Sequence, residues 1–255
     1  MTPRRPTPRR PWRGRAAVVP WVERVSLKPE LLDGSLDDPA ALSGNLRDLK
    51  RANRWLGGAR LSSWAIEALL GGIDEASILD VGTGAADIPL ALLDIARRRG
   101  HGRKVTAVDS RSEVIAAARI GSPRLQSTPD LVIEVADGRS LPYDDHVFDV
   151  SHASLVIHHL EPADAVAFMQ ELARVARIGV VVNDLVRSRV TLAGAWLMSH
   201  LLTTNRYTRH DAPLSARRAY SRAELIALLD AAGLRVVADH GGLAGHRRAL
   251  AAVRP

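Results

Sequence analysis

The twelve residues ILDVGTGAADIP, at positions 78–89, decide the fold that we expect for this chain. An apolar run leads into a tight turn built on Gly82 and Gly84, and a helical pattern begins directly after the turn. A strand, a glycine turn and a helix in this order are typical of the first crossover of a doubly wound sheet, where ligands bind beyond the carboxyl ends of the strands. The turn is therefore the first candidate for a binding site.

Strand and helix patterns alternate along the following residues, which predicts an α/β fold with a doubly wound, mostly parallel, seven-stranded sheet of the Rossmann-like kind. We expect its strands at residues 77–81, 104–109, 130–137, 147–155, 178–184, 234–240 and 246–254. Helices are expected at residues 88–100, 112–121, 162–177 and 221–233. At the start of the last helix, Ser221 and Glu224 have the spacing of a capping box.

Composition divides the chain into parts. Residues 1–20 form an Arg- and Pro-rich arm that we expect to be disordered, because it has too little apolar surface to bury. Residues 21–75 predict a helical cover. Residues 76–255 predict the main domain, with an apolar, irregular lid insert at residues 185–220 after the fifth strand.

Charge and cysteine usage exclude several classes of protein. Residues 1–15 hold six arginines and no acidic residue, which leaves the rest of the chain at +1 of the formal net charge of +7. A nucleic-acid partner is thus suggested by the arm alone. The chain has no cysteine, which excludes disulfides, thiolate metal sites and a cysteine nucleophile. The nine histidines lack a recognisable ligand spacing, so we expect no metal, and the absence of a membrane-spanning run predicts a cytoplasmic protein.

The carboxylates near the turn indicate what kind of ligand it holds. A dinucleotide-binding turn would have a third glycine where this chain has Asp87, whose charge repels phosphate but accepts hydrogen bonds from an ammonium group. Asp109 ends the second strand, where a carboxylate can accept both hydroxyls of a ribose. Asp137 and Gly138 follow the third strand, where an adenine amino group can be read. Together these residues predict a site for adenosine joined to an amino acid.

The segments ILDVGTGAADI, VTAVD, VADGRSLPYDDHVFDV and SLVIHHLEP resemble the class I S-adenosylmethionine-dependent methyltransferases in order and spacing, over residues 77–253. The resemblance implies the doubly wound, Rossmann-like fold of that family and S-adenosylmethionine as the cofactor. It places Asp80 and the two turn glycines along the methionine part, Asp109 at the ribose and Asp137 at the adenine. The expected cofactor-binding residues are Asp80, Gly82, Gly84, Asp87, Asp109, Ser110, Asp137, Gly138 and Ser154.

Several features favour a small organic acceptor. The residues Ser151 to Leu155 replace the Asn/Asp-Pro-Pro-aromatic motif common in methyltransferases that act on nucleobase amino groups, which argues against nucleic acid. The apolar insert follows the fifth strand, over the expected site, and can shape an organic pocket. Residues 182–190 and 205–221 also resemble segments of bacterial methyltransferases found beside polyketide synthases and of relatives of quinone-biosynthesis enzymes. We therefore expect an aromatic or polyketide-derived acceptor.

A phenolic acceptor must lose a proton, and histidine is the side chain best suited to accept it near neutral pH. The catalytic candidates are His158 and His159, after the fourth strand, and His210 paired with Asp211 in the insert. Asp184, at the end of the fifth strand, is a further pocket candidate.

The sequence thus predicts O-methylation of a phenolic or polyketide-derived compound, with C-methylation of a quinol-type ring as the second candidate reaction. Three further classes of protein stay open, namely an RNA methyltransferase that uses the arm, a nicotinamide oxidoreductase and a ligand-binding relative without catalysis. The acceptor, the identity of the base and the oligomeric state are also open at this point.

Overall fold

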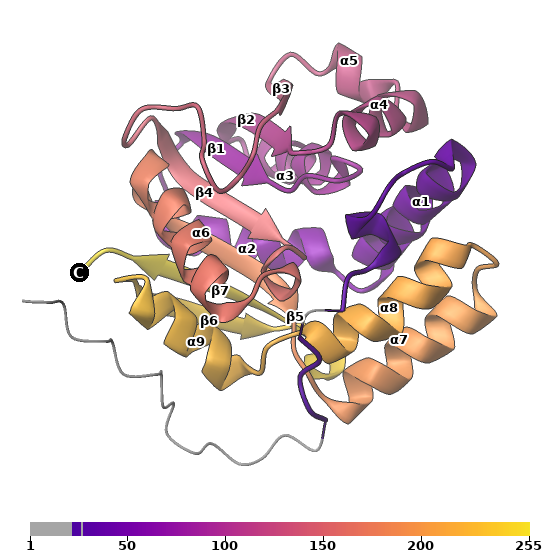
Figure 1. The fold of residues 1–255 in the computed structure, drawn as a ribbon. Helices are drawn as coiled ribbons and strands as arrows, with labels where there is room; N and C mark the ends of the chain where they lie inside the picture. The colour runs from indigo at the N-terminus through magenta and orange to yellow at the C-terminus, as the bar shows by residue number, and fades with distance from the viewer. Residues whose placement is uncertain (1–21, 27) are drawn as a thin grey trace, which may run out of the picture.

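The computed structural model describes residues 22–26 and 28–255, in which a seven-stranded sheet has the strand order β3-β2-β1-β4-β5-β7-β6 (Figure 1). The strands are β1 (Glu75–Val81), β2 (Gly102–Asp109), β3 (Leu131–Val135), β4 (Phe148–Ser154), β5 (Ala176–Leu185), β6 (Arg235–Gly241) and β7 (Arg247–Val253). Only β7 runs antiparallel to its neighbours, β5 and β6. The doubly wound, mostly parallel sheet predicted from the sequence is confirmed. The arm predicted at residues 1–20 lies outside the described residues.

Helices precede the sheet and alternate with its strands. They are α1 (Pro39–Trp55), α2 (Gly58–Leu70), α3 (Asp87–Arg98), α4 (Ser112–Gly121), α5 (Arg124–Ser127), α6 (Pro162–Val175), α7 (Arg189–Leu201), α8 (Arg206–Arg218) and α9 (Arg222–Ala231). Short 3₁₀ turns are η1 (Leu31–Asp33), η2 (Ile157–His159) and η3 (Leu243–Gly245). None of the helices within these described ranges is long and apolar enough to cross a membrane.

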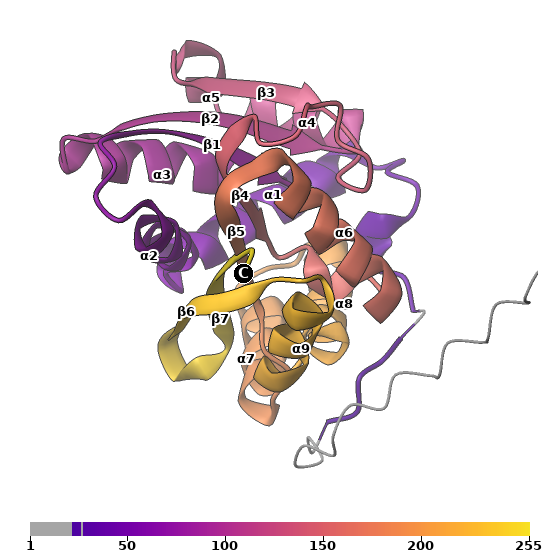
Figure 2. The ribbon, with the colours of Figure 1, turned by 90° about the vertical axis from the view of Figure 1, so that its left-hand side faces the viewer.

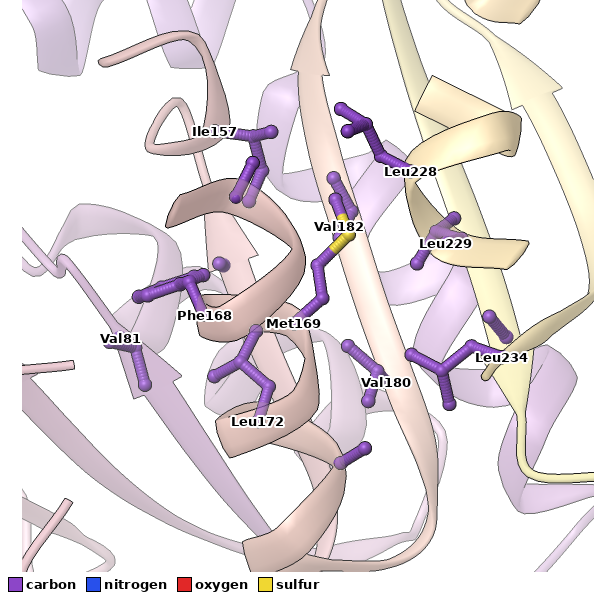
Figure 3. Packing of buried hydrophobic residues seen from close by; sticks show 14 of the residues in the cluster. Val81, Ile157, Phe168, Met169, Leu172, Val180, Val182, Leu228, Leu229 and Leu234 are labelled. Atoms are coloured by element: carbon purple, nitrogen blue, oxygen red, sulfur yellow. The ribbon is translucent and has the colours of Figure 1, made fainter. Parts of the chain in front are cut away.

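The two faces of the sheet carry different helices (Figure 2). On one face, α6 and α9 bury a core against β4 and β5, in which Met169 and Leu172 of α6 contact the valines of β5 (Figure 3). On the other face, α2 covers β4, β5 and β7 and α3 covers β2, through a second core that includes Ile66 and Leu93. Burial of a Leu or Met side chain contributes roughly 1.5–3 kcal/mol, so both layers are held mainly by apolar packing.

Local sequence signals explain where several helices begin. At α9, the backbone N–H of Glu224 donates to Ser221 Oγ at 3.3 Å, and the N–H of Ser221 donates to Glu224 Oε2 at 2.7 Å. This is the capping box that the sequence predicts. At α6, Pro162 occupies the first helical position, where its missing N–H leaves no bond unmade.

The insert at residues 185–220 forms the helix pair α7 and α8, which lies beside α1 (Figure 1). A third apolar cluster joins Tyr207 of α8 to Leu42 and Leu46 of α1 and to Val114 of α4. The insert and the N-terminal helices therefore meet on the same side of the molecule, next to the carboxyl ends of the parallel strands.

Asp149 on β4 links the neighbouring strands and predicts a pH dependence of stability. Burial alone would raise the pKa of Asp149, but hydrogen bonds from Ser77 (N···Oδ2 2.8 Å) and Arg177 (Nε···Oδ1 3.0 Å) outweigh it and lower the pKa. A lowered folded-state pKa stabilises the protein above the unfolded pKa of about 3.9, and the contribution is lost as the pH falls through the folded value. We expect Asp149→Asn to lower the free energy of unfolding by about 1–2 kcal/mol at pH 7.

Urea unfolding measured from pH 7 down to pH 3 checks this prediction. The difference between wild type and Asp149→Asn should shrink toward the acid end, whereas the exposed neighbour variant Asp144→Asn should stay within about 0.5 kcal/mol throughout. A difference that is constant over this pH range would contradict the assignment.

Candidate active site

A cavity of about 390 Å³ lies at the carboxyl ends of β1, β2 and β4. Its wall also includes residues of α1, α7 and α8, so the N-terminal helices and the insert enclose the strand ends (Figure 1). Among the residues expected to bind the cofactor, the lining contains Asp80, Gly82, Gly84, Asp87, Asp109, Ser110 and Ser154. Of the catalytic candidates and the further pocket candidate, it contains His158, His159 and Asp211, whereas His210 and Asp184 are not part of it.

The turn after β1 has the left-handed backbone that its glycines permit. Gly82 has a φ of 74° and Gly84 a φ of 55°. The backbone N–H groups of Gly82 and Thr83 both donate to Val108 O, at 2.8 and 2.9 Å, which ties the turn to the end of β2. A Cβ on Gly82 would lie 2.4 Å from Val156 Cγ2, whereas a Cβ on Gly84 would have no neighbour within 4 Å. Gly82 is therefore required by both conformation and space.

This difference predicts unequal effects of alanine at the two positions. Both variants place a side chain in the left-handed region, which lowers the free energy of unfolding by about 1–2 kcal/mol. Only Gly82→Ala also adds a clash with a stiff β-branched side chain, which lowers it by about 1–3 kcal/mol more. Chemical denaturation should therefore show a loss of about 2–5 kcal/mol for Gly82→Ala and about 1–2 kcal/mol for Gly84→Ala. Equal losses would mean that Val156 moves aside freely.

Asp109 ends β2 with its carboxylate at the cavity. Its Oδ2 accepts the N–H of Gly84 at 3.0 Å, and its Oδ1 accepts the N–H of Arg111 at 3.1 Å. Burial raises the pKa of Asp109, and these two hydrogen bonds offset part of the rise. The side chain is thus fixed by the backbone while further lone pairs of the carboxylate stay available to a ligand.

The carboxylates at the two ends of the glycine turn are joined by a buried polar network. Asp80 Oδ1 lies 2.5 Å from His152 Nδ1, and His152 Nε2 lies 2.7 Å from Ser62 Oγ, which accepts Asn183 Nδ2 at 2.8 Å. These donors and acceptors are consistent with a neutral imidazole protonated on Nδ1. Asp80 therefore holds a histidine of β4 as well as lining the cavity.

Arg247 on β7 continues the network from Asn183 to Asp87. Its Nε donates to Asn183 Oδ1 at 2.6 Å and its Nη1 to Asn53 Oδ1 at 2.8 Å, and its Nη2 also bonds to Ser154 Oγ. Asn53 Nδ2 in turn donates to Asp87 Oδ2 at 3.2 Å. Burial raises the pKa of Asp87 and lowers that of Arg247 to about 10. Sequence reasoning missed Asn53, His152 and Arg247, because no local pattern marks them.

Asp137 and Gly138 lie away from this cavity. The carboxylate of Asp137 forms an exposed ion pair with Arg139, at 2.7 Å, and neither Asp137 nor Gly138 lines the pocket. A Cβ on Gly138 would lie 2.5 Å from Val81 Cγ1, so close packing accounts for this glycine. Contact of these two residues with adenine stays a prediction.

The two histidines of η2 also line the cavity, and each is paired with a carboxylate. His158 Nδ1 lies 2.7 Å from Asp184 Oδ1, and His159 Nδ1 lies 2.9 Å from Asp33 Oδ1. Asp184 does not line the cavity itself, but it holds the imidazole of His158, which does. Asp33 was not among the predicted residues, since nothing in the local sequence links it to the fourth strand.

The predicted pair of His210 and Asp211 forms, but at a different place from the η2 histidines. His210 Nδ1 lies 2.7 Å from Asp211 Oδ1, and the imidazole of His210 is exposed. Asp211 also accepts the N–H groups of Leu31 and Leu32, at 2.8 and 3.1 Å. It therefore fixes η1 over the cavity.

The donor set fits S-adenosylmethionine. The glycine turn lets the backbone approach a ligand, the side-chain oxygen of Thr83 beside it is buried with no partner among the described residues, and Asp109 offers a carboxylate to ribose hydroxyls. Asp87 adds the negative charge that suits an ammonium group and opposes a phosphate.

Comparison with known proteins agrees with this chemistry. Residues 79–182 match the model of a family described as a methyltransferase domain. The chain is 38% identical over 72 residues to the ubiquinone/menaquinone biosynthesis C-methyltransferase UbiE of Rickettsia akari, covering 28% of this chain and 29% of that protein. It is 29% identical over 170 residues to the malonyl-[acyl-carrier protein] O-methyltransferase of Geobacter sulfurreducens, covering 65% of this chain and 58% of that protein. The chain spans less than two thirds of the length of each of these relatives.

A solved structure has the same fold. The O-methyltransferase family 2 protein from Planctomyces limnophilus, in complex with apigenin, superposes with a TM-score of 0.61 at 17% identity, over 88% of this chain and 64% of that one. From its family match over residues 79–182 and its sheet order, this chain carries an S-adenosylmethionine-dependent methyltransferase domain with the class I fold.

Proposed function

We propose that this protein transfers the methyl group of S-adenosylmethionine to a small organic acceptor, namely the oxygen of a phenolic or polyketide-derived compound. The observation that carries the proposal is one shared cavity, which runs from the glycine turn and Asp109 to the imidazoles of His158 and His159. Holding two reactants in line at about 3 Å supplies most of the acceleration that such a displacement needs.

The residues at the turn would hold the donor. Asp109 would accept the ribose hydroxyls, and Asp87 would accept the ammonium group of the methionine part, with Asn53 and Arg247 fixing the Asp87 carboxylate from behind. When bound, S-adenosylmethionine supplies a methyl group on a positively charged sulfur, which leaves as a neutral thioether.

The opposite wall is suited to an organic acceptor. It contains Met198 and Leu202 from the insert and Leu46 and Leu49 from α1. Apolar side chains in a cavity with a few convergent polar groups are typical of small-molecule sites, and they keep water from the reacting atoms. The helix pair therefore supplies acceptor recognition, as the sequence predicts for the insert.

The acceptor's proton would leave at the η2 histidines. With each Nδ1 bonded to a carboxylate, the Nε2 atoms of His158 and His159 face Glu30, which also lines the cavity. The hydroxyl proton would be released at this pair while the oxygen–carbon bond forms and the carbon–sulfur bond breaks. The second predicted pair, His210 with Asp211, is less well placed, since His210 does not line the cavity.

The names of the similar proteins point to two kinds of acceptor atom. The O-methyltransferase from Geobacter and the apigenin complex favour oxygen, whereas the match to UbiE favours a ring carbon as the second candidate. A hydroxyarene that is ionised at the same histidines is nucleophilic at its ortho carbon as well as at its oxygen. The two products have the same mass and differ in the NMR shift of the new methyl group.

The test is turnover of a panel of phenols and quinols, with the product's methyl group assigned by NMR. We expect O-methylation, and expect His159→Asn to lower kcat about 10²–10⁴-fold while binding of S-adenosylhomocysteine changes less than about threefold. The matched control is His200→Asn on α7, whose imidazole stacks on Trp196 and does not line the cavity. Binding of S-adenosylhomocysteine without turnover of any acceptor would reject the proposal in favour of a ligand-binding role.

A further inference from the structure

Three electron-pair donors converge at the acceptor end of the cavity, on Glu30, His158 and His159. His158 Nε2 lies 3.9 Å from Glu30 Oε1, and His159 Nε2 lies 3.9 Å from Glu30 Oε2. One ligand atom from each of the three side chains can be chosen so that all three lie within 4.8 Å of one another. Glu30 and His158 are buried and His159 is half-buried, so bulk water solvates the group poorly.

The hydrogen bonds of the two histidines determine which nitrogen carries the proton. His158 Nδ1 is held by Asp184 at 2.7 Å and His159 Nδ1 by Asp33 at 2.9 Å. A carboxylate only accepts, so each Nδ1 carries a proton, and each Nε2 is the ring nitrogen left to bind a cation beside Glu30. This carboxylate–histidine arrangement is the one that typically orients histidines bound to a metal.

Two side chains besides the histidines approach the Glu30 carboxylate among the described residues, namely Ser215 and Arg218. Glu30 Oε1 accepts Ser215 Oγ at 2.9 Å. Arg218 Nη1 is 4.0 Å from Glu30 but donates to Asp33 at 2.8 Å. The remaining nitrogens of Arg218 donate to the backbone carbonyls of His158 and His159. The arginine thus neutralises Asp33 and fixes η2, while the Glu30 carboxylate faces the Nε2 atoms of the two histidines.

We infer that Glu30, His158 and His159 bind one divalent cation of the first transition series, with Zn²⁺ as the representative ion, and keep at least one coordination position open to the cavity. Two imidazoles and one carboxylate form the protein ligand set of several catalytic zinc sites. Ligands at zinc bond lengths of about 2.0–2.2 Å in a tetrahedron are about 3.4 Å apart. The two separations of 3.9 Å therefore need to close by about half an ångström, and the widest one, which is within 4.8 Å, by up to about 1.4 Å.

The role of this cation rests on the proposed function. An acceptor hydroxyl at the open position would lose its proton more readily, because a bound divalent cation lowers the pKa of an oxygen ligand. The proton goes to solvent, the acceptor oxygen forms the bond to the methyl carbon, and the carbon–sulfur bond breaks without any change in oxidation state. With the cation bound, His158 and His159 act as ligands that position the acceptor and the proton leaves to solvent, whereas without it the pair accepts the proton directly.

The experiment uses the tag-free full chain, stripped with EDTA and dialysed against metal-free buffer. Calorimetric titration with ZnCl₂ should show one ion per chain at micromolar affinity or tighter, and titration with Co²⁺ should give the visible absorption of a four- or five-coordinate ion. Glu30→Gln and His158→Asn should each weaken the affinity at least a hundredfold. His210→Asn, a histidine that also pairs with a carboxylate but lies outside the cavity wall, should bind like wild type.

Each outcome separates this inference from the proposed function. Uptake lost in Glu30→Gln, with an unchanged melting temperature and unchanged S-adenosylhomocysteine binding, supports the site. Equal uptake in wild type and Glu30→Gln, or no uptake, overturns it. If the stripped enzyme methylates an acceptor at the full rate and Zn²⁺ adds nothing, the inference fails while the proposed function stands. If the ion binds but no acceptor is methylated, the site stands and the proposed function fails.

Discussion

Asp109→Ala is expected to weaken binding of S-adenosylhomocysteine by roughly 10²–10⁴-fold. The reason is the loss of two charge-assisted hydrogen bonds to the ribose hydroxyls, each contributing about 1.5–3 kcal/mol. The carboxylate is held in place by the N–H groups of Gly84 and Arg111, so it needs no reorganisation when the ligand arrives. Isothermal titration calorimetry on the purified chain gives the affinity directly.

A neighbouring carboxylate serves as the control for Asp109. Glu113 on α4 is exposed and pairs with Arg111 across the surface, so Glu113→Ala should leave the affinity within about twofold. Affinity of Asp109→Ala within threefold of wild type would place the ribose elsewhere and remove the main support for the donor site.

The pH dependence of binding follows from the same residue. Burial raises the pKa of Asp109, and the ionised form is the one that accepts two hydroxyls. Affinity should therefore be full at neutral pH and fall on acidification, beginning above the usual range of an aspartate. In Asp109→Asn this fall should be much shallower, because the amide does not titrate.

The largest loss of stability is expected for Arg247→Met. Its buried guanidinium satisfies Asn53, Asn183 and Ser154 at once, and its charge offsets the nearby carboxylates of Asp87 and Asp184. Removal of one partner from a buried, hydrogen-bonded charge network typically lowers the free energy of unfolding by about 3–5 kcal/mol. Urea denaturation measures the change, and binding of S-adenosylhomocysteine should weaken too, because Asn53 no longer has a fixed orientation toward Asp87.

The adjacent arginine offers a matched control for this substitution. Arg248 lies next to Arg247 on β7 but pairs with Asp239 near the surface, at 2.5 Å. Arg248→Met makes the same chemical change in the same strand and should lower stability by about 1 kcal/mol or less. Similar losses in both variants would show that loss of packing, rather than the buried network, accounts for the effect.

Much of the donor end could be predicted because it depends on local properties of the chain. A glycine turn between an apolar strand and a helix fixes Gly82 and Gly84, and the end of the next strand fixes Asp109 at the same edge of a parallel sheet. The expectation for Asp137 used the same logic and stays a prediction; β3 ends at Val135, and in the loop after it the Asp137 carboxylate pairs with Arg139. Loop direction after a strand is not encoded in the strand's own pattern.

The sequence by itself determined the order of strands and helices, the capping box of α9 and the glycine turn, because hydrophobic periodicity, capping and backbone freedom act within a few residues. Only the tertiary structure decided that His152 meets Asp80, 72 residues away, and that Arg247 meets Asn53, 194 residues away. The same holds for the approach of Glu30 to His158 and His159, because these residues do not have the sequence spacing of a known metal site. These contacts depend on which strands become neighbours and on how the helices before β1 fold over their ends, and no short stretch of sequence contains that information.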